Sequence, residues 1–161
     1  MSYVQDLLEE LHREALSTRR LMERIPEAYL AWKPHAKSMS LGQLALHTAG
    51  LPGELAVLLN APVREVPTVP LPEAGSVSEI FAVLEEQLAK AEDILRSWGD
   101  EGLRESFKWT VQGAVVSETS RFEQVRSVLL NHGYHHRGQL TVYLRLLDVP
   151  VPGLYGPSAD E

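Results

Sequence analysis

Residues 120–146 read SRFEQVRSVLLNHGYHHRGQLTVYLRL, a stretch with the periodicity of one long amphipathic helix. Its apolar and aromatic side chains recur every three or four residues, which places them on one helix face. The helix is expected to begin at Ser120, because Ser120 and Glu123 match a capping box that satisfies free backbone N–H groups. The prolines of residues 149–153 should end it. The predicted face consists of Phe122, Val125, Leu129, His132, His136, Gln139, Tyr143 and Leu146.

Two segments near the start of the chain have the same helical period. The first covers residues 4–25 and should end before Pro26. The second begins with a capping box at residues 40–43 and contains Pro52, which is expected to kink this helix just past His47. The short connection between these two helices predicts that they are antiparallel neighbours.

A third helical segment follows a connector rich in proline. It begins with a capping box at residues 76–79 and should be ended by Gly99 and Gly102. The connector, residues 60–75, is expected to be extended and to cross over the bundle, so that the third helix can run parallel to the second. Its helix-breaking residues are Pro62, Pro67, Pro70, Pro72 and Gly75.

Residues 103–119 are the part of the chain with the weakest periodicity. Phe107, Trp109 and Val111 alternate with polar residues, which predicts either a short strand or an irregular flap. We expect residues 100–119 to line part of the substrate pocket. The four helices and the long crossover between helices 2 and 3 predict an all-α four-helix bundle that forms a single domain over residues 1–161.

Composition excludes several classes of protein. The chain has 161 residues, six histidines, no cysteine and a net charge of −7. Without cysteine there is no disulfide, no cysteine zinc site, no iron–sulfur cluster and no protein thiol nucleophile. The acidic balance argues against nucleic acid as a partner. The sequence begins without a signal-peptide pattern, and polar residues interrupt the apolar stretch 41–63, so we expect a cytoplasmic protein that does not span a membrane.

Three histidines take apolar positions on the predicted helix faces. His132 and His136 are four residues apart, so their rings stack one turn apart on one face and can reach one ion. His47 lies on the face of the second helix. Metal sites in bundles are built from such inward-facing side chains on different helices. The pattern predicts a three-histidine site for a divalent metal with one open coordination position, whereas a lone buried histidine would more often be a hydrogen-bonded core residue.

Other polar residues have both a functional and a structural interpretation. Glu54 lies two turns after His47 and could act as a catalytic base, although a surface acid explains its position as well. Gln139 could donate or accept hydrogen bonds in a pocket, and Arg137 could bind an anion or be solvated. His135 is a rival metal ligand but falls outside the predicted face. His12 and His35 are expected to be structural or solvated.

Several of these segments resemble the DinB-like (DinB/YfiT) metalloenzyme superfamily. They are Trp-Lys-Pro-His at 32–35, Ser-Leu-Gly-Gln-Leu-Ala-Leu-His at 40–47, His-Gly-Tyr-His-His-Arg-Gly-Gln at 132–139, and the C-terminal stretch 140–161. The histidine-rich segment with an upstream histidine is the most specific of them. Asp148 departs from the pattern, since many members have glycine at this helix end.

The resemblance implies a four-helix bundle with a long crossover and a metal held by His47, His132 and His136. Zinc or nickel is the metal expected from it, and a homodimer is the expected assembly. Characterised members are bacillithiol transferases and mycothiol-dependent isomerases, which use low-molecular-weight thiols.

Three hypotheses for function follow. The first is a metal-dependent S-transferase that acts on a small-molecule substrate with a low-molecular-weight thiol as cosubstrate. The second is a hydrolase in which the metal lowers the pKa of a bound water and Glu54 acts as base. The third is a non-catalytic, stress-related metal-binding protein.

Overall fold

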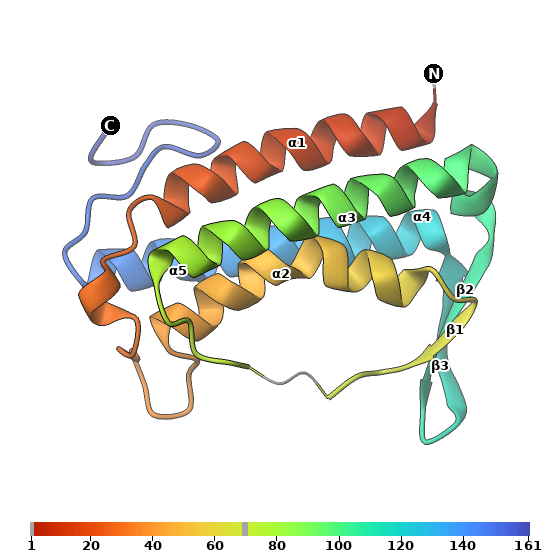
Figure 1. The fold of residues 1–161 in the computed structure, drawn as a ribbon, viewed down its shortest axis with the longest axis horizontal. Coiled ribbons are helices and arrows are strands. Elements are labelled where there is room, and N and C mark those ends of the chain that lie inside the picture. The colour runs from red at the N-terminus through yellow and green to blue at the C-terminus, as the bar shows by residue number, and fades with distance from the viewer. Residues whose placement is uncertain (1, 69–70) are drawn as a thin grey trace.

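Four long helical segments and a small sheet make up the computed structural model, which describes residues 2–68 and 71–161 (Figure 1). The first three segments are α1 (Tyr3–Met22), α2 (Leu41–Leu59) and α3 (Val77–Arg104). The fourth runs without a break through α4 (Arg121–Gln124), the π-helical segment η2 (Val125–Leu130) and α5 (Asn131–Leu146). A short 3-10 turn, η1 (Glu27–Tyr29), follows α1. Pro70, which the sequence analysis placed in the connector, lies outside the described residues.

Side-chain caps begin the helices where the sequence predicts them. The Ser40 hydroxyl accepts a hydrogen bond from the Gln43 backbone N–H at 3.0 Å, and the Gln43 side chain accepts one from the Ser40 N–H at 2.9 Å. The capping box at the start of α4 is also complete. At α3, Ser76 accepts from the Glu79 N–H, but the Glu79 carboxylate accepts from Gly75 instead. The α2 helix continues through Pro52.

The connector returns along the bundle, so that α2 and α3 run parallel, as predicted, while α1 and the fourth segment run the opposite way (Figure 1). Both α1 and α2 pack mainly against α3 and α5. The prediction that α1 and α2 are adjacent is therefore wrong. They are antiparallel but lie at opposite corners of the bundle, because the parallel crossover brings α3 between them.

A three-stranded sheet closes one end of the bundle, and it corrects the expected all-α class (Figure 1). The strands β2 (Ser106–Val111) and β3 (Ala114–Ser120) form a hairpin, and β1 (Val63–Glu65), from the connector, pairs in parallel with β2. The turn residues Gln112 and Gly113 have φ of 51° and 77°, as a two-residue hairpin turn requires. The strand interpretation of residues 103–119 is confirmed.

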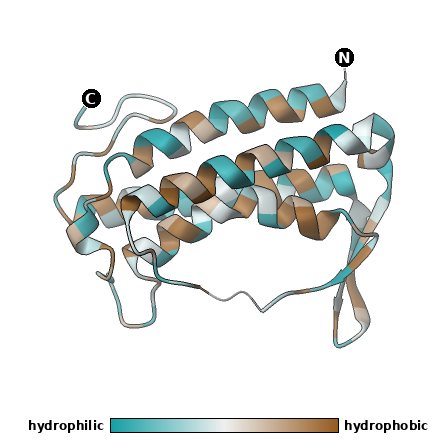
Figure 2. Ribbon diagram, viewed as in Figure 1, coloured by the Kyte–Doolittle hydropathy of each residue, from teal (hydrophilic) through white to brown (hydrophobic). Residues whose placement is uncertain are grey.

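Buried apolar side chains form two clusters along the bundle, and apolar and polar residues alternate along each helix (Figure 2). One cluster includes Leu21, Leu44 and Leu144, and the other includes Leu8 and Phe107. The second cluster extends into the sheet, because alternate side chains of β2 face inward. Among the helices of residues 2–68 and 71–161, none combines the length and the apolar character that crossing a membrane requires.

Candidate metal centre

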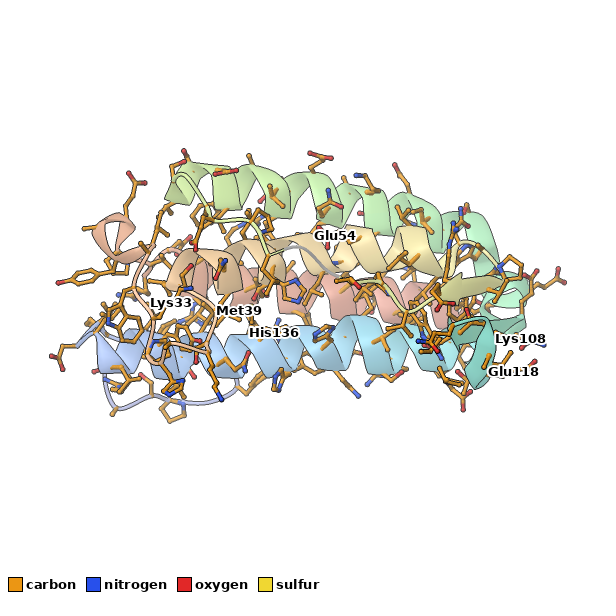
Figure 3. All side chains as sticks on the ribbon, turned by 90° about the horizontal axis from the view of Figure 1, so that it is seen from below. Lys33, Met39, Glu54, Lys108, Glu118 and His136 are labelled. Carbon is orange, nitrogen blue, oxygen red and sulfur yellow. The ribbon has the colours of Figure 1, made fainter. Side chains whose placement is uncertain are left out.

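The three predicted ligands, His47, His132 and His136, meet between α2 and α5. The ring centroids of His47 and His136 are 4.7 Å apart, those of His132 and His136 are 4.5 Å apart, and those of His47 and His132 are 5.6 Å apart. One nitrogen of each ring lies within 4.8 Å of the other two. His136 projects from α5 toward α2 (Figure 3). The structure therefore brings together residues that are 85 to 89 positions apart in the sequence.

The π-helical segment η2 directly precedes the histidine-bearing part of α5. A π-turn contains more residues per turn than an α-helix, so it shifts the face on which later side chains lie. Leu129 and Leu130 are both buried before it ends, and His136 and Arg137 are both buried after it. Such π-helical turns are frequent next to functional sites.

Hydrogen bonds behind two of the rings determine which nitrogen faces the centre. The Nδ1 atom of His136 lies 2.7 Å from the amide oxygen of Gln139. An amide oxygen only accepts, so Nδ1 carries the proton and Nε2 keeps its lone pair. His132 is hydrogen-bonded to the backbone of Val128, one turn earlier. The Nε2 atoms of His132 and His136 lie 2.8 Å apart and face the same point.

All three histidines have a pKa below the ordinary value of 6.5. Burial is the largest cause in each case, because it disfavours the charged imidazolium. The neighbouring imidazoles add to this effect, and the pKa of His136 is lowered to about 4. The rings are therefore neutral at pH 7, which is the form of histidine that binds metal ions.

The donor set suits a divalent transition metal. Imidazole nitrogens bind zinc at about 2.0–2.1 Å, so two nitrogens on one ion lie at most about 4.2 Å apart. The three nitrogens already lie within 4.8 Å of one another, so small side-chain movements bring them into range. His47 and His132 are only partly buried, which leaves one side of the group accessible to a further ligand. Three neutral imidazoles with an accessible side are typical of an open metal site.

Glu54, the candidate catalytic base, does not belong to this convergent group. Its side chain is exposed on α2 and lines a groove beside the connector, together with Leu58, Pro67 and Gln87 (Figure 3). Its role as a base stays a prediction.

The other three histidines do not belong to the convergent group. His135 is exposed, and its ring centroid is 5.0 Å from that of His136. His12 contacts Glu92 at 3.0 Å, and the Nδ1 atom of His35 accepts a hydrogen bond from the backbone N–H of Lys37 at 3.1 Å. These positions agree with the expectation that they are surface or structural residues.

Arg137 is neither exposed to bulk solvent nor free to bind an anion. It is 3% exposed, forms an ion pair with Glu14 of α1, and donates to the hydroxyl of Tyr155 in the C-terminal segment. The neighbouring Tyr134 hydroxyl donates to Glu10, one turn before Glu14. Sequence reasoning missed the acidic partners, because nothing in the local pattern of α1 indicates contact with residues more than 120 positions away.

Comparisons with known proteins agree with this architecture. The chain is 27% identical over 152 residues to the uncharacterized protein YrdA of Bacillus subtilis (strain 168), which covers 92% of this chain and 85% of that protein. A crystal structure of a DinB-like protein from Bacillus cereus ATCC 10987 superposes with a TM-score of 0.75 at 22% identity, covering 94% and 97% of the two chains.

The DinB-like protein YjoA of Bacillus subtilis superposes with a TM-score of 0.70 at 17% identity, covering 95% of this chain and 99% of that one. At these identities, the two structures show a shared fold. The family model described as DinB family matches residues 1–161. The chain, with its helical bundle and its converging histidines, belongs to the DinB family.

Proposed function

We propose that the protein is a divalent-metal-dependent enzyme whose ion is held by His47, His132 and His136, and that it transfers a low-molecular-weight thiol to a small electrophilic substrate. The observation that carries the metal proposal is the convergence of three neutral imidazoles within 4.8 Å, with two of them oriented by hydrogen bonds. Zinc and nickel are the ions that we expect, because both accept imidazole ligands.

The thiol proposal rests on the resemblance to superfamily members that use low-molecular-weight thiols, and the accessible side of the site is compatible with it. A bound divalent ion would supply a Lewis acid that favours the nucleophilic thiolate over the thiol. The chain has no cysteine, so the reacting sulfur must arrive with a small molecule. The three histidines would hold the ion, and the accessible side beside His47 and His132 would leave room for both reactants.

Elemental analysis of the purified protein tests the metal proposal. We expect about one equivalent of metal per chain in the wild type and a large loss in His47→Ala and in His132→Ala. His35→Ala is the matched control, since His35 lies in a loop outside the group, and it should retain the metal. Substoichiometric metal that His47→Ala leaves unchanged would overturn the proposal.

A pair of activity assays tests the reaction class. Thiol transfer to a panel of electrophiles, measured with and without an added low-molecular-weight thiol, should give turnover only when the thiol is present. Turnover of esters or amides without thiol would replace the transferase by a hydrolase, and Glu54→Gln would then show whether this carboxylate is the base. Metal without turnover and without an exchangeable ligand, as seen by cobalt spectroscopy, would indicate a non-catalytic metal-binding protein.

We also propose that the chain forms a homodimer, as the family resemblance implies. Light scattering coupled to size-exclusion chromatography should give twice the chain mass of 17.9 kDa. A mass that stays at the monomer value over a range of concentrations would exclude the dimer.

A further inference from the structure

A small, partly open cavity lies between α1, α2, α3 and the fourth helical segment. Its volume is about 30 Å³, and six of its fourteen lining residues are leucines. A cavity of about 10–15 Å³ is already large enough for one water molecule when polar partners are available. The polar residues on its wall are Glu14, Thr18, Thr48, Tyr134 and Arg137.

The guanidinium group of Arg137 contributes a buried donor to this wall. Its Nη1 atom donates to the Glu14 carbonyl at 2.8 Å and to the Thr18 hydroxyl at 2.9 Å, and Nη2 donates to the Glu14 carboxylate and to Tyr155. The Nε–H has no hydrogen-bond partner among residues 2–68 and 71–161, although the residue is only 3% exposed. A buried donor without a partner is costly, so most such groups in folded proteins bind protein or water.

The proline in α2 leaves one backbone carbonyl of this helix without its regular donor. Proline has no backbone N–H, so Pro52 cannot donate the regular α-helical hydrogen bond to the Thr48 carbonyl four residues earlier. Pro52 and Thr48 both line the cavity. Two groups near the cavity therefore lack a regular partner. The Thr48 carbonyl receives no hydrogen bond from Pro52, and the Arg137 Nε–H has no acceptor within the described part of the chain.

We propose that an internal water molecule binds in this cavity, where it accepts a hydrogen bond from Arg137 Nε–H and donates one to the Thr48 carbonyl. A neutral ligand fits better than an anion, because the Glu14 carboxylate already neutralises the guanidinium. A water with partners on both helices satisfies both groups and links α2 to α5.

The proposed water lies next to the histidine group, whether or not a metal ion is bound there. Thr48, Gly133 and Arg137 line the cavity, and each directly follows one of the three converging histidines in the sequence. The water therefore lies in the core behind the histidine group, where it helps to set the spacing of the two helices that carry the rings.

A crystal structure at a resolution that shows internal waters tests the proposal directly. We expect a density peak within about 2.7–3.2 Å of Arg137 Nε inside the cavity, whether or not metal is bound. An empty cavity, or an Nε–H that donates to a protein acceptor instead, would overturn the proposal.

Nuclear magnetic resonance provides an independent test in solution. Cross-relaxation between water and the Arg137 Nε–H should show a long-lived bound water in the wild type. Ala15→Val adds bulk to the cavity wall and should abolish this signal, whereas Leu16→Val, at an exposed neighbouring position, should leave it unchanged. A signal that persists in Ala15→Val would show that the water lies elsewhere. If Ala15→Val does not fold, the wild-type crystal structure decides alone.

Discussion

Gln139 is the residue that decides which nitrogen of His136 faces the other two rings. Its amide oxygen holds Nδ1 at 2.7 Å, and removing such a partner of a metal ligand typically weakens metal binding about 10–100-fold. We expect Gln139→Leu to show a loss of this size in a titration against a competing chelator. Gln139→Glu keeps an acceptor at this position and should bind at least as tightly as the wild type. Equal affinities for the leucine variant and the wild type would contradict this role.

His136 should make the stability of the metal-free protein dependent on pH. Its pKa is about 4 in the folded chain, against an ordinary value of 6.5. Between these values the unfolded chain binds more protons than the folded chain, so the free energy of unfolding should fall as the pH falls from 7 toward 4. Urea unfolding at pH 7 and pH 5 measures the change.

The control for the pH experiment is His136→Gln, which cannot titrate in this range. Its free energy of unfolding should decrease less between pH 7 and pH 5 than that of the wild type. An equal decrease in both proteins would mean that other groups cause the dependence.

At the scale of elements, the end of α5 holds Asp148 in a backbone conformation that favours glycine. Asp148 has φ of 56°, the Val149 N–H donates to the Leu144 carbonyl at 3.0 Å, and the Asp148 N–H donates to the Arg145 carbonyl at 3.2 Å. These bonds form a Schellman motif, whose left-handed residue is usually glycine. Aspartate tolerates this conformation better than most residues do, but glycine adopts it without steric cost.

Substitutions at position 148 should therefore change stability in opposite directions. Asp148→Gly is expected to raise the free energy of unfolding by about 0.5–1 kcal/mol, because relief of the left-handed strain outweighs the added entropy of glycine in the unfolded chain. Asp148→Ala should lower it, because the left-handed conformation costs about 1–2 kcal/mol and alanine lacks the short polar side chain that lets aspartate tolerate it. Thermal unfolding of the two variants beside the wild type measures both effects. A stabilising alanine would show that the backbone conformation differs from a left-handed one.

At the scale of the whole molecule, the buried pair of Arg137 and Glu14 joins α5 to α1. Their side chains are 4% and 15% exposed, and breaking a buried ion pair by removing one partner typically costs about 3–5 kcal/mol. We expect Arg137→Met to lower the free energy of unfolding by about this amount. Urea denaturation measures it.

An exposed pair provides the control for this measurement. Arg96 contacts Glu92 at 2.6 Å on the surface of α3, where an ion pair contributes less than about 1 kcal/mol. Arg96→Met should therefore change stability little. Similar losses in the two methionine variants would show that burial does not determine the contribution of Arg137.

Short segments of the sequence determine most of the helices and the histidine positions of this protein without reference to tertiary contacts. Helical periodicity, the serine caps at Ser40, Ser76 and Ser120, and the histidines on apolar faces are all properties of short segments, so the sequence alone predicts four helices and three converging rings. The hairpin was predictable only as one of two alternatives, because its alternation extends over few residues.

The tertiary structure alone decided which distant segments are in contact. The diagonal placement of α1 and α2, the pairing of β1 with β2 and the ion pair of Arg137 with Glu14 each join segments that the local pattern does not relate. The strand β1 has three exposed residues and no apolar alternation, so only its hydrogen bonds to β2 define it. Sequence periodicity indicates which face of a helix is buried, but it contains no information on which helix covers that face, and that choice follows from packing the whole chain.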